Sequence, residues 1–447
     1  MVRLKKTLMI YCIIVGLFNI IGCDFWITNH NQNSKEQHTY WPSLADSPWP
    51  MHAHDPQHTG RSPYAGPEYG EIDWNVDLGS EVDASSPVIG ENNAIYVGVS
   101  RDFNGIYGYS AEGQQIMSLS LGGRLTTSPV LARDNIIYIG STITSESADG
   151  IAAITTAGNV LWELNTPAKG KYNYPVPDIT GDFLYLLTQN YILKIHAATG
   201  VIRDSLTVSE RIVFRGMAPA FSNDGKTLYA TGGFYGDSWS EGSAVLFAFD
   251  TSGTHLWTYD TNFRDDSFDM SYPSVDNQGT IYFQAPLGVH AVNPDGSLKW
   301  TFKTNDGTEC FNGVSIGIDG TLYFTAIFSG IVYALNSDGT KLWEYDLNLL
   351  FISEKDFGGK TVENAPVLDN SGNVYIGMEA LSAGDGSLFE NDTLNVAGLK
   401  PDGTLRFALH VPDDGELKTY DIYSMASISS NRRLFITVEN GFLVAIK

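Results

Sequence analysis

The chain has little positive charge and almost no cysteine. Its 447 residues include 27 Lys and Arg against 51 Asp and Glu, which gives a formal net charge of −24. A surplus of this size repels phosphate backbones and anionic lipid surfaces, so nucleic acid is excluded as a partner and polybasic docking to membranes is disfavoured. The three cysteines, Cys12, Cys23 and Cys310, are too few to form a disulfide framework.

The sequence also lacks the common catalytic signatures. It contains no Gly-x-Ser-x-Gly, no His-Glu-x-x-His and no phosphate-binding Gly-x-x-x-x-Gly-Lys-Ser/Thr. His52, His54 and His58 lie close together and could contribute to a Zn²⁺ or Cu²⁺ site. Because no Cys or Glu ligand is near them, we expect these histidines to be packing residues and no metal to be bound. No catalytic residue can be assigned, which favours a protein that is not an enzyme.

A single apolar run, Leu8–Gly22, follows a basic start and precedes Cys23. It is shorter than the ~20 residues that a membrane-spanning helix needs and has the form of a secretory signal. Its end, Ile20-Ile21-Gly22-Cys23, resembles the lipobox of bacterial lipoproteins, which implies cleavage before Cys23 and attachment of a lipid to that residue. Asp24 is similar to the signal that keeps enterobacterial lipoproteins on the inner membrane, but an anchor in the outer membrane stays open.

Four parts of the chain are predicted. Residues 1–22 form the signal peptide, and residues 23–48, rich in Asn, Gln, His and Ser, form a lipidated flexible tether. Residues 49–71 are a lead-in segment, and residues 72–447 carry repeats.

Internal repeats are the strongest signal in the sequence. An aliphatic–aromatic doublet within a short β-type run recurs as Ile95-Tyr96, Ile137-Tyr138, Leu184-Tyr185, Leu228-Tyr229, Ile281-Tyr282, Leu322-Tyr323, Val374-Tyr375 and Leu434-Phe435. A glycine turn follows each doublet except the last. The position four residues past that glycine, called here the slot, holds Met117, Trp162, Asp204, Trp257, Trp300, Trp343 and Phe407. Units of four short strands and about 47 residues predict the blades of a propeller.

The last unit lacks a fourth strand because the chain ends at Lys447. Residues 72–78 have the same pattern around Trp74, so we predict that this N-terminal strand completes the last blade and removes both exposed sheet edges. The predicted fold is therefore all-β, an eight-bladed β-propeller of four-stranded antiparallel blades. Seven blades are the alternative, should the poorly matching third unit merge with a neighbour.

The glycine turn, the slot tryptophan and the doublet together resemble the pyrroloquinoline-quinone-like (PQQ-like) repeat, and residues 49–63 are similar to the segment that precedes the first blade in such proteins. The resemblance implies that slot tryptophans dock between adjacent blades, here Trp74, Trp162, Trp257, Trp300 and Trp343. In architecture the chain is similar to the β-propeller lipoprotein of the outer-membrane β-barrel assembly machinery and to the propeller of quinoprotein dehydrogenases.

The second of these resemblances implies a bound quinone, a Ca²⁺ site, an Asp base and usually a disulfide of two neighbouring cysteines. The chain has no such cysteine pair and no Arg or Lys cluster that would hold an anionic quinone. We therefore expect no cofactor, with PQQ and calcium as the alternative.

Length variation concentrates in the connections between second and third strands and between blades, which lie on one face of a propeller. Binding function is often carried by such loops on a rigid scaffold. The candidate partner-binding rim on these loops consists of Phe234, Tyr235, Trp239, Asp265, Asp266, Phe268, Asp269, Phe357, Asp385 and Tyr420. The alternative is that these loops are tolerated insertions whose aromatic side chains pack on the blades.

The expected function is that of a non-enzymatic, lipid-anchored, monomeric propeller that binds a protein or a glycan at the bacterial cell envelope. The anchor would lie in the outer leaflet of the cytoplasmic membrane or in the outer membrane. The alternatives are a quinone- or metal-dependent oxidoreductase of the quinoprotein type and a degenerate quinoprotein that binds a small ligand.

Overall fold

The computed structural model describes most of the chain from Trp41 onward. The described residues are 41–79, 82, 85–100, 103–122, 125, 127–141, 150–166, 174–208, 212–214, 218–234, 243–264, 270–286, 288–304, 312–327, 329–350, 360–380, 394–411, 422, 424–439 and 441–447. The predicted signal peptide, the lipidation site Cys23 and the other two cysteines lie outside these residues. Among the described residues, no helix is both long and apolar enough to cross a membrane.

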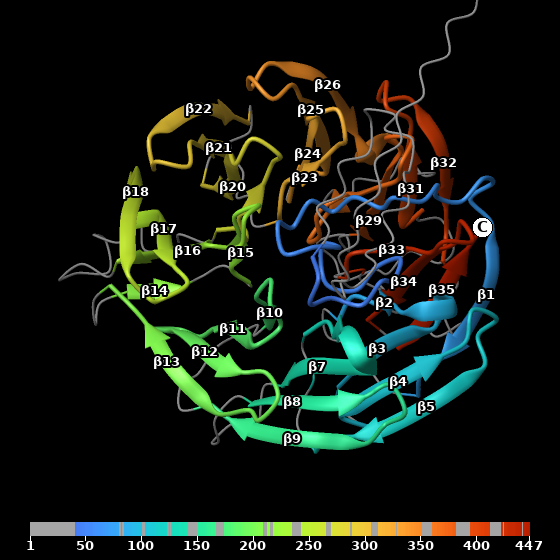
Figure 1. The fold of residues 1–447 in the computed structure, drawn as a ribbon. Helices are drawn as coiled ribbons and strands as arrows, with labels where there is room; N and C mark the ends of the chain where they lie inside the picture. The colour runs from blue at the N-terminus through green and yellow to red at the C-terminus, as the bar shows by residue number, and fades with distance from the viewer. Residues whose placement is uncertain are drawn as a thin grey trace, which may run out of the picture. The chain divides into compact units, whose positions relative to one another are not determined.

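The described strands form eight antiparallel blades arranged around a ring (Figure 1). Blade 1 contains β2 (Val88–Ile89), β3 (Ile95–Val99), β4 (Gly105–Tyr109) and β5 (Gln115–Ser120). Blade 2 contains β6 (Val130–Ala132), β7 (Ile136–Ser141), β8 (Gly150–Thr155) and β9 (Val160–Asn165). Blade 3 contains β10 (Val176–Pro177), β11 (Phe183–Leu187), β12 (Ile192–His196) and β13 (Ile202–Leu206). Blade 4 contains β14 (Ile212–Phe214), β15 (Ala220–Phe221), β16 (Thr227–Phe234), β17 (Ser243–Asp250) and β18 (His255–Arg264).

The second half of the ring follows the same plan. Blade 5 contains β19 (Ser274–Val275), β20 (Ile281–Ala285), β21 (Gly288–Val292) and β22 (Leu298–Lys303). Blade 6 contains β23 (Ser315–Ile316), β24 (Leu322–Ala326), β25 (Ile331–Leu335) and β26 (Lys341–Asp346). Blade 7 contains β28 (Val367–Leu368), β29 (Val374–Gly377), β31 (Val396–Leu399) and β32 (Leu405–Leu409), beside the small ribbon of β27 (Lys360–Thr361) and β30 (Glu379–Ala380). Blade 8 contains β33 (Ser427–Ile428), β34 (Leu434–Val438), β35 (Phe442–Ile446) and β1 (Ile72–Asp77).

The eight-bladed prediction is confirmed, and the seven-bladed alternative is wrong, because the third unit forms a separate four-stranded sheet. The described 3₁₀ turns are short: η1 (Glu91–Asn93), η2 (Arg133–Asn135) and η4 (Leu347–Leu350). The first-to-second and third-to-fourth strand turns of each blade share one face of the ring, called here the turn face. In the middle strands almost every side chain is buried, as in β24, while outer strands such as β26 alternate exposed and half-buried positions.

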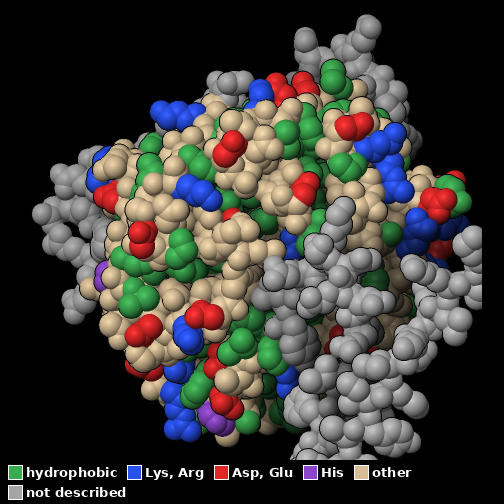
Figure 2. All heavy atoms as spheres, turned by 45° about the horizontal axis from the view of Figure 1, so that its top comes forward, with side chains coloured by type: hydrophobic (Ala, Val, Ile, Leu, Met, Phe, Trp, Pro, Cys, Tyr) green, Lys and Arg blue, Asp and Glu red, His purple; other side chains and the backbone are tan. Residues whose placement is uncertain are grey.

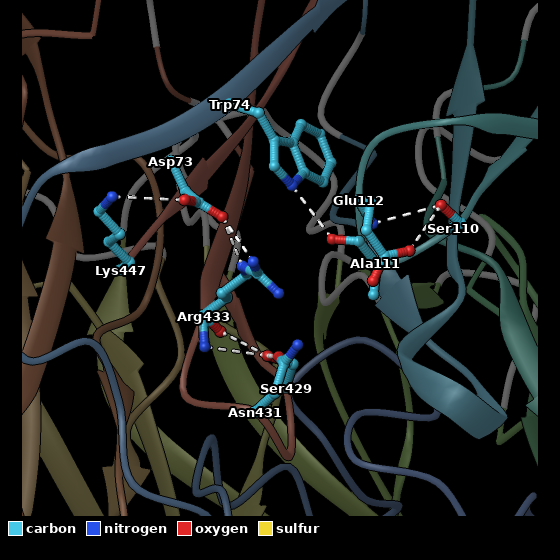
Figure 3. Close-up of polar contacts among 9 residues, drawn as sticks. All are labelled: Asp73, Trp74, Ser110, Ala111, Glu112, Ser429, Asn431, Arg433 and Lys447. Carbon is cyan, nitrogen blue, oxygen red and sulfur yellow. Dashed lines mark hydrogen bonds and ion pairs between the residues drawn. The ribbon is translucent and has the colours of Figure 1, made fainter.

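The predicted closure by the N-terminal strand is confirmed. Strand β1 pairs antiparallel with β35, and Trp74 lies opposite Ala445. An ion pair joins the same two chain regions, because Asp73 lies 2.6 Å from Arg433 Nη2 and 3.5 Å from Lys447 Nζ (Figure 3). Gly70 N donates to the backbone oxygen of Lys447 at 2.9 Å, so two segments from opposite ends of the chain imitate a hairpin turn.

The five slot tryptophans each lie against the glycine turn of the next blade. A Cβ atom added to these glycines would lie 2.6–3.0 Å from an indole carbon, so only glycine allows the contact. Each indole Nε1 donates to a carbonyl two or three residues before the glycine, at 3.1 Å for Trp74 and Ala111 (Figure 3) and 2.9 Å for Trp343 and Pro401. The glycines are Gly113, Gly200, Gly296, Gly339 and Gly403, all with positive φ.

At two slots that lack tryptophan, other side chains make the contacts with the next blade. Phe407 packs on Gly70, and the neighbouring Arg406 donates to Glu68 O at 3.3 Å. At the slot of Asp204, the turn carbonyl of the next blade accepts a hydrogen bond from a lysine in place of an indole. Lys194 Nζ donates to Thr251 O at 2.7 Å. The departures from tryptophan at these two slots therefore leave the seams between blades closed.

Asp-rich turns are hairpin turns, as the sequence indicates, and their carboxylates bond to their own backbone. Asp338 Oδ1 accepts the Thr340 N–H at 2.9 Å and the Thr340 hydroxyl at 2.6 Å. The hydroxyl and then the backbone bond lower the pKa of Asp338. Asp295 and Ser297 repeat this arrangement in blade 5. Part of the surplus acid therefore serves backbone geometry.

Closure through β1 predicts a local effect of Trp74→Ala. The substitution removes an indole that holds a sequence-distant strand, so amides of Leu443, Val444 and Ala445 should exchange with solvent at least tenfold faster. The free energy of unfolding should fall by up to about 3 kcal/mol, since the indole is half-buried. Trp257→Ala, within a continuous stretch of chain, is the matched control and should leave exchange in β35 unchanged. Equal exchange in both variants would show that β1 is held in other ways.

Candidate functional site

The lead-in segment lies across the innermost strands at the turn face. At least one backbone N–H in each of blades 1, 2, 4, 5, 6 and 7 donates to a lead-in carbonyl. The donors are Ile89, Leu131, Phe221, Val275, Ile316 and Leu368, and the acceptors in the same order are Trp49, Pro50, Pro56, Gln57, Thr59 and Gly60. Blade 3 is contacted by residues that precede the predicted lead-in. Trp41 Nε1 donates to Pro177 O at 3.1 Å, and the Ser43 hydroxyl donates to Asp178 O.

This packing moves one predicted boundary. Residues 41–48 were expected to be part of the flexible tether, but Trp41 and Leu44 are buried and Leu44 pairs with Ala132 of blade 2. The lead-in therefore begins at Trp41 in the structure and comprises residues 41–71, because the apolar side chains of residues 41–48 find partners on blades 2 to 4.

Side chains of the lead-in fill the central channel. The His52 ring lies between Tyr174 of blade 3 and Tyr272 of blade 5, with ring centroids 4.7 Å and 5.1 Å away. The Tyr272 hydroxyl reaches Met425 Sδ of blade 8 at 3.3 Å, so this tyrosine spans the channel. The His58 ring also packs edge-on against Tyr272, with a centroid distance of 5.0 Å. We call these five side chains the plug; at this level the channel is closed by packed rings.

The plug keeps its histidines neutral. Burial, and to a smaller extent the nearby His58, lowers the pKa of His52 to about 3. Burial likewise lowers the pKa of His58 to about 4, although its hydrogen bond to Pro273 O opposes this. Burial would raise the pKa of Asp55, but bonds from His54 and Thr59 bring it to about 2. The channel centre is thus a desolvated region with one well-bonded carboxylate at its edge.

The three histidines do not form a metal site. Within the part of the chain that the structure describes, no three His, Cys, Asp or Glu side chains are placed to hold a metal ion. His52 and His58 pack on Tyr272, whereas the His54 ring contacts Trp49 at 5.0 Å and its Nδ1 lies 3.2 Å from Asp55. An extended segment would have placed His52 and His54 on one face, but positive φ at Ala53 and His54 turns the chain between them.

The predicted rim residues are not brought together by any described contact. Phe234 ends strand β16, where its backbone pairs with Ile212 and Ser243. The other nine rim residues lie outside the described residues, so the rim stays a prediction. On the face drawn in Figure 2, acidic and basic side chains are interspersed, and the surplus acid forms no continuous field there.

A groove of about 790 Å³ lies on the turn face at the seam between blades 1 and 2. Its inner wall is the lead-in stretch 44–46, and η1 and η2 form two further walls. Tyr96, Leu131 and Ile116 contribute apolar surface, and Ile116 is 53% exposed. The acidic lining residues are Asp46, Glu91, Glu112 and Asp134, and the single cation among the described lining residues is Arg133.

Sequence reasoning missed this groove, although one signal pointed to it. The seam between blades 1 and 2 has Met117 in its slot, and Met117 Cγ lies 3.3 Å from the position that a Cβ of Gly158 would take. Methionine has no N–H to donate and covers less surface than an indole. Gly70 was also overlooked, although it precedes Trp74 by the same four residues as the other turn glycines.

These repeats and their docking define the chain as a β-propeller with PQQ-like repeats. The family model described as "Outer membrane protein assembly factor BamB" matches residues 65–233, which is less than half of the chain. The match begins just before β1 and covers blades 1 to 3 and part of blade 4. The chain is thus a BamB-like propeller in fold and repeat type. No curated protein matches it.

Solved structures with the same fold are distant in sequence. BamB from Moraxella catarrhalis is 15% identical with a TM-score of 0.58, covering 84% of this chain and 99% of that one. The Dos1 propeller is 12% identical with a TM-score of 0.60, covering 86% and 96%. The C-terminal WD40 domain of Sif2 is 10% identical with a TM-score of 0.59, covering 86% and 99%. At these identities the likeness shows the fold alone.

The plug predicts a loss of stability in acid. Unfolded histidines bind a proton near pH 6.5, but His52 and His58 in the fold do so only near pH 3 and 4. Between these values the unfolded chain binds more protons, so the free energy of unfolding falls as the pH falls from about 6.5 towards 4. His58→Asn should remove roughly 3 kcal/mol of this acid-induced loss.

Denaturant unfolding at pH 7 and pH 4.5 measures this difference. Asparagine suits position 58 because it tolerates the positive φ found there. The exposed His255→Asn is the control and should keep the full loss between the two pH values. Parallel pH dependence in wild type and His58→Asn would contradict a neutral His58 in the plug.

Proposed function

We propose that the protein is an exported, lipid-anchored β-propeller that binds another protein at the bacterial cell envelope and acts as a scaffold without catalysis or a bound cofactor. The observation that carries this proposal is the plug. Because Tyr272 and the lead-in histidines close the channel at their level, recognition is left to the outer surfaces. The groove between blades 1 and 2 and the predicted rim are two such surfaces.

Further support comes from the likeness to BamB, which is an outer membrane protein assembly factor. The lipobox-like end of the apolar run, with Cys23, supports an anchor at the membrane. Together they favour an envelope location, with an exported propeller held on a lipid.

The quinoprotein alternative has a direct test. The full-length protein is incubated with pyrroloquinoline quinone and Ca²⁺ and assayed for dye-linked dehydrogenase activity. We expect no turnover, because the plug fills the described channel with side chains from the lead-in and from blades 3, 5 and 8. Quinone-dependent turnover that disappears when Ca²⁺ is chelated would overturn the scaffold proposal.

The anchor is tested with Cys23→Ser in cells that produce the full chain. The wild type should incorporate a labelled fatty acid and sediment with membranes, whereas the variant should incorporate none and lose most of its membrane association. Cys310→Ser is the matched control and should behave as the wild type. Retained fatty-acid label in Cys23→Ser would place the lipid elsewhere.

The rim is tested by shortening its longest segment. Residues 381–393 are replaced by a short Gly-Ser linker, which spares Asn395, whose side chain accepts the Val411 N–H at 2.8 Å. If the rim binds the partner, partner recovery in a pull-down should fall at least tenfold while the melting temperature stays within a few degrees. Unchanged recovery would remove this loop from the binding surface.

A further inference from the structure

We propose that the groove between blades 1 and 2 is the docking site for a basic, partly apolar segment of the protein partner. The inference rests on the proposed binding function and adds the partner's chemistry and the place where it binds. Three features of the groove lead to it: how the groove arises, which charges surround it, and which occupants its charge excludes.

The groove arises from the slot residue. At seams closed by tryptophan, the indole lies on the next glycine turn and donates to a carbonyl two or three residues before the glycine. At the seam between blades 1 and 2, Met117 reaches Gly158 but has no donor for the corresponding carbonyl of Thr156. Thr156 and Ile116, the neighbour of Met117, line the groove instead. Met117 thus covers the glycine, while the side of the turn next to Thr156, where an indole Nε1 lies at the other seams, opens into the groove.

The charged side chains around the groove are mostly acidic. Asp46, Glu91 and Asp134 come from three different chain segments, and within the described residues none of their carboxylates forms a hydrogen bond or an ion pair. Glu112 is the fourth carboxylate, and it accepts only the hydroxyl of Ser110 among described side chains (Figure 3). Arg133 is the one cation among the lining residues that the structure describes. Such an arrangement attracts Lys and Arg side chains and increases the rate of encounter with them.

The walls are held in place before any partner arrives. The lead-in wall is held by a hydrogen bond and a β-bridge to blade 2. The Ala45 N–H donates to Leu131 O at 3.0 Å, and Leu44 pairs with Ala132. In η1 and η2, consecutive Asn and Asp residues adopt positive φ, including Asn92 and Asp134. The groove is thus largely preformed, and its volume lies within the range of about 300–1,000 Å³ that is usual for binding pockets.

Two occupants from the chain itself are disfavoured by charge. The part of the predicted tether that precedes Trp41, residues 24–40, carries Asp24 and Glu36 against Lys35 and is therefore slightly acidic. A second copy of the chain would bring a net charge of −24 towards an acidic groove. A different protein with Lys or Arg beside apolar side chains complements both the carboxylates and the exposed Ile116.

The test places a photoreactive amino acid at chosen positions of the full-length, membrane-anchored protein in cells. Position 116 lies in the groove, and position 342 is its matched control, because Leu342 also precedes a slot residue and is 49% exposed. Position 239 samples the rim. We expect an adduct at 116 and none at 342, and mass spectrometry of the adduct should identify a segment of net positive charge.

Two sets of substitutions then examine the cause. Asp46→Asn, Glu91→Gln and Asp134→Asn together should reduce the adduct at least tenfold and weaken the binding of the purified partner about tenfold at low salt, with little difference at high salt. Met117→Trp should also reduce the adduct at least tenfold, because the indole would occupy the groove. This variant restores the usual slot residue, so its melting temperature should equal or exceed that of the wild type.

Several outcomes would overturn the inference. Adducts at 239 without any at 116 would remove the groove and leave the scaffold function standing. An adduct at 116 that carries an acidic segment, or that persists in both the carboxylate and the Met117→Trp variants, would contradict the proposed chemistry. If no position forms an adduct, the groove and the scaffold function fail together.

Discussion

The whole ring depends on one contact, a flat side chain laid on a glycine that has no Cβ, with a donor reaching a nearby carbonyl. Repeated around the ring, this contact sets the angle between blades and buries the apolar flank of each outer strand. Tryptophan meets both requirements with one side chain. Where it is absent, the requirements separate: Phe407 supplies the ring while Arg406 supplies the donor. At that seam the ring and the donor are both kept although the residue type changes, whereas Met117 supplies neither of them.

The sequence alone was sufficient for the architecture because repetition reveals it. Eight doublets, turn glycines at a fixed spacing and a stray tryptophan strand ahead of the first unit predicted blade number and closure correctly. Sites were harder to predict, since they depend on contacts between segments that share no spacing. Nothing in His52 or Tyr272 alone shows that they meet in the channel, because the lead-in must first be threaded across most of the blades. The groove was not predicted, because the methionine in its slot was interpreted only as a departure from the repeat pattern.

The lead-in connects architecture to function. It satisfies backbone donors on six blades, places neutral histidines in the channel against tyrosines of blades 3 and 5, and supplies one wall of the acidic groove. A propeller often offers its channel mouth as a binding site, but here that position is occupied by the chain's own residues. Recognition is therefore shifted outward to seams and loops, where charge and exposed apolar side chains can vary without disturbing the ring.

Closure of the last blade has a consequence for the order of events during synthesis. Strand β1 is made before all the other described strands, but its partner β35 is made after them, so Ile72 cannot pair with Ile446 until the rest of the ring has been synthesised. Until then both edges of the unfinished sheet are open to wrong partners. A chain interrupted at any earlier point keeps those edges exposed, and a protease or chaperone can recognise it as incomplete. Synthesis of β35 thus marks the completion of the ring.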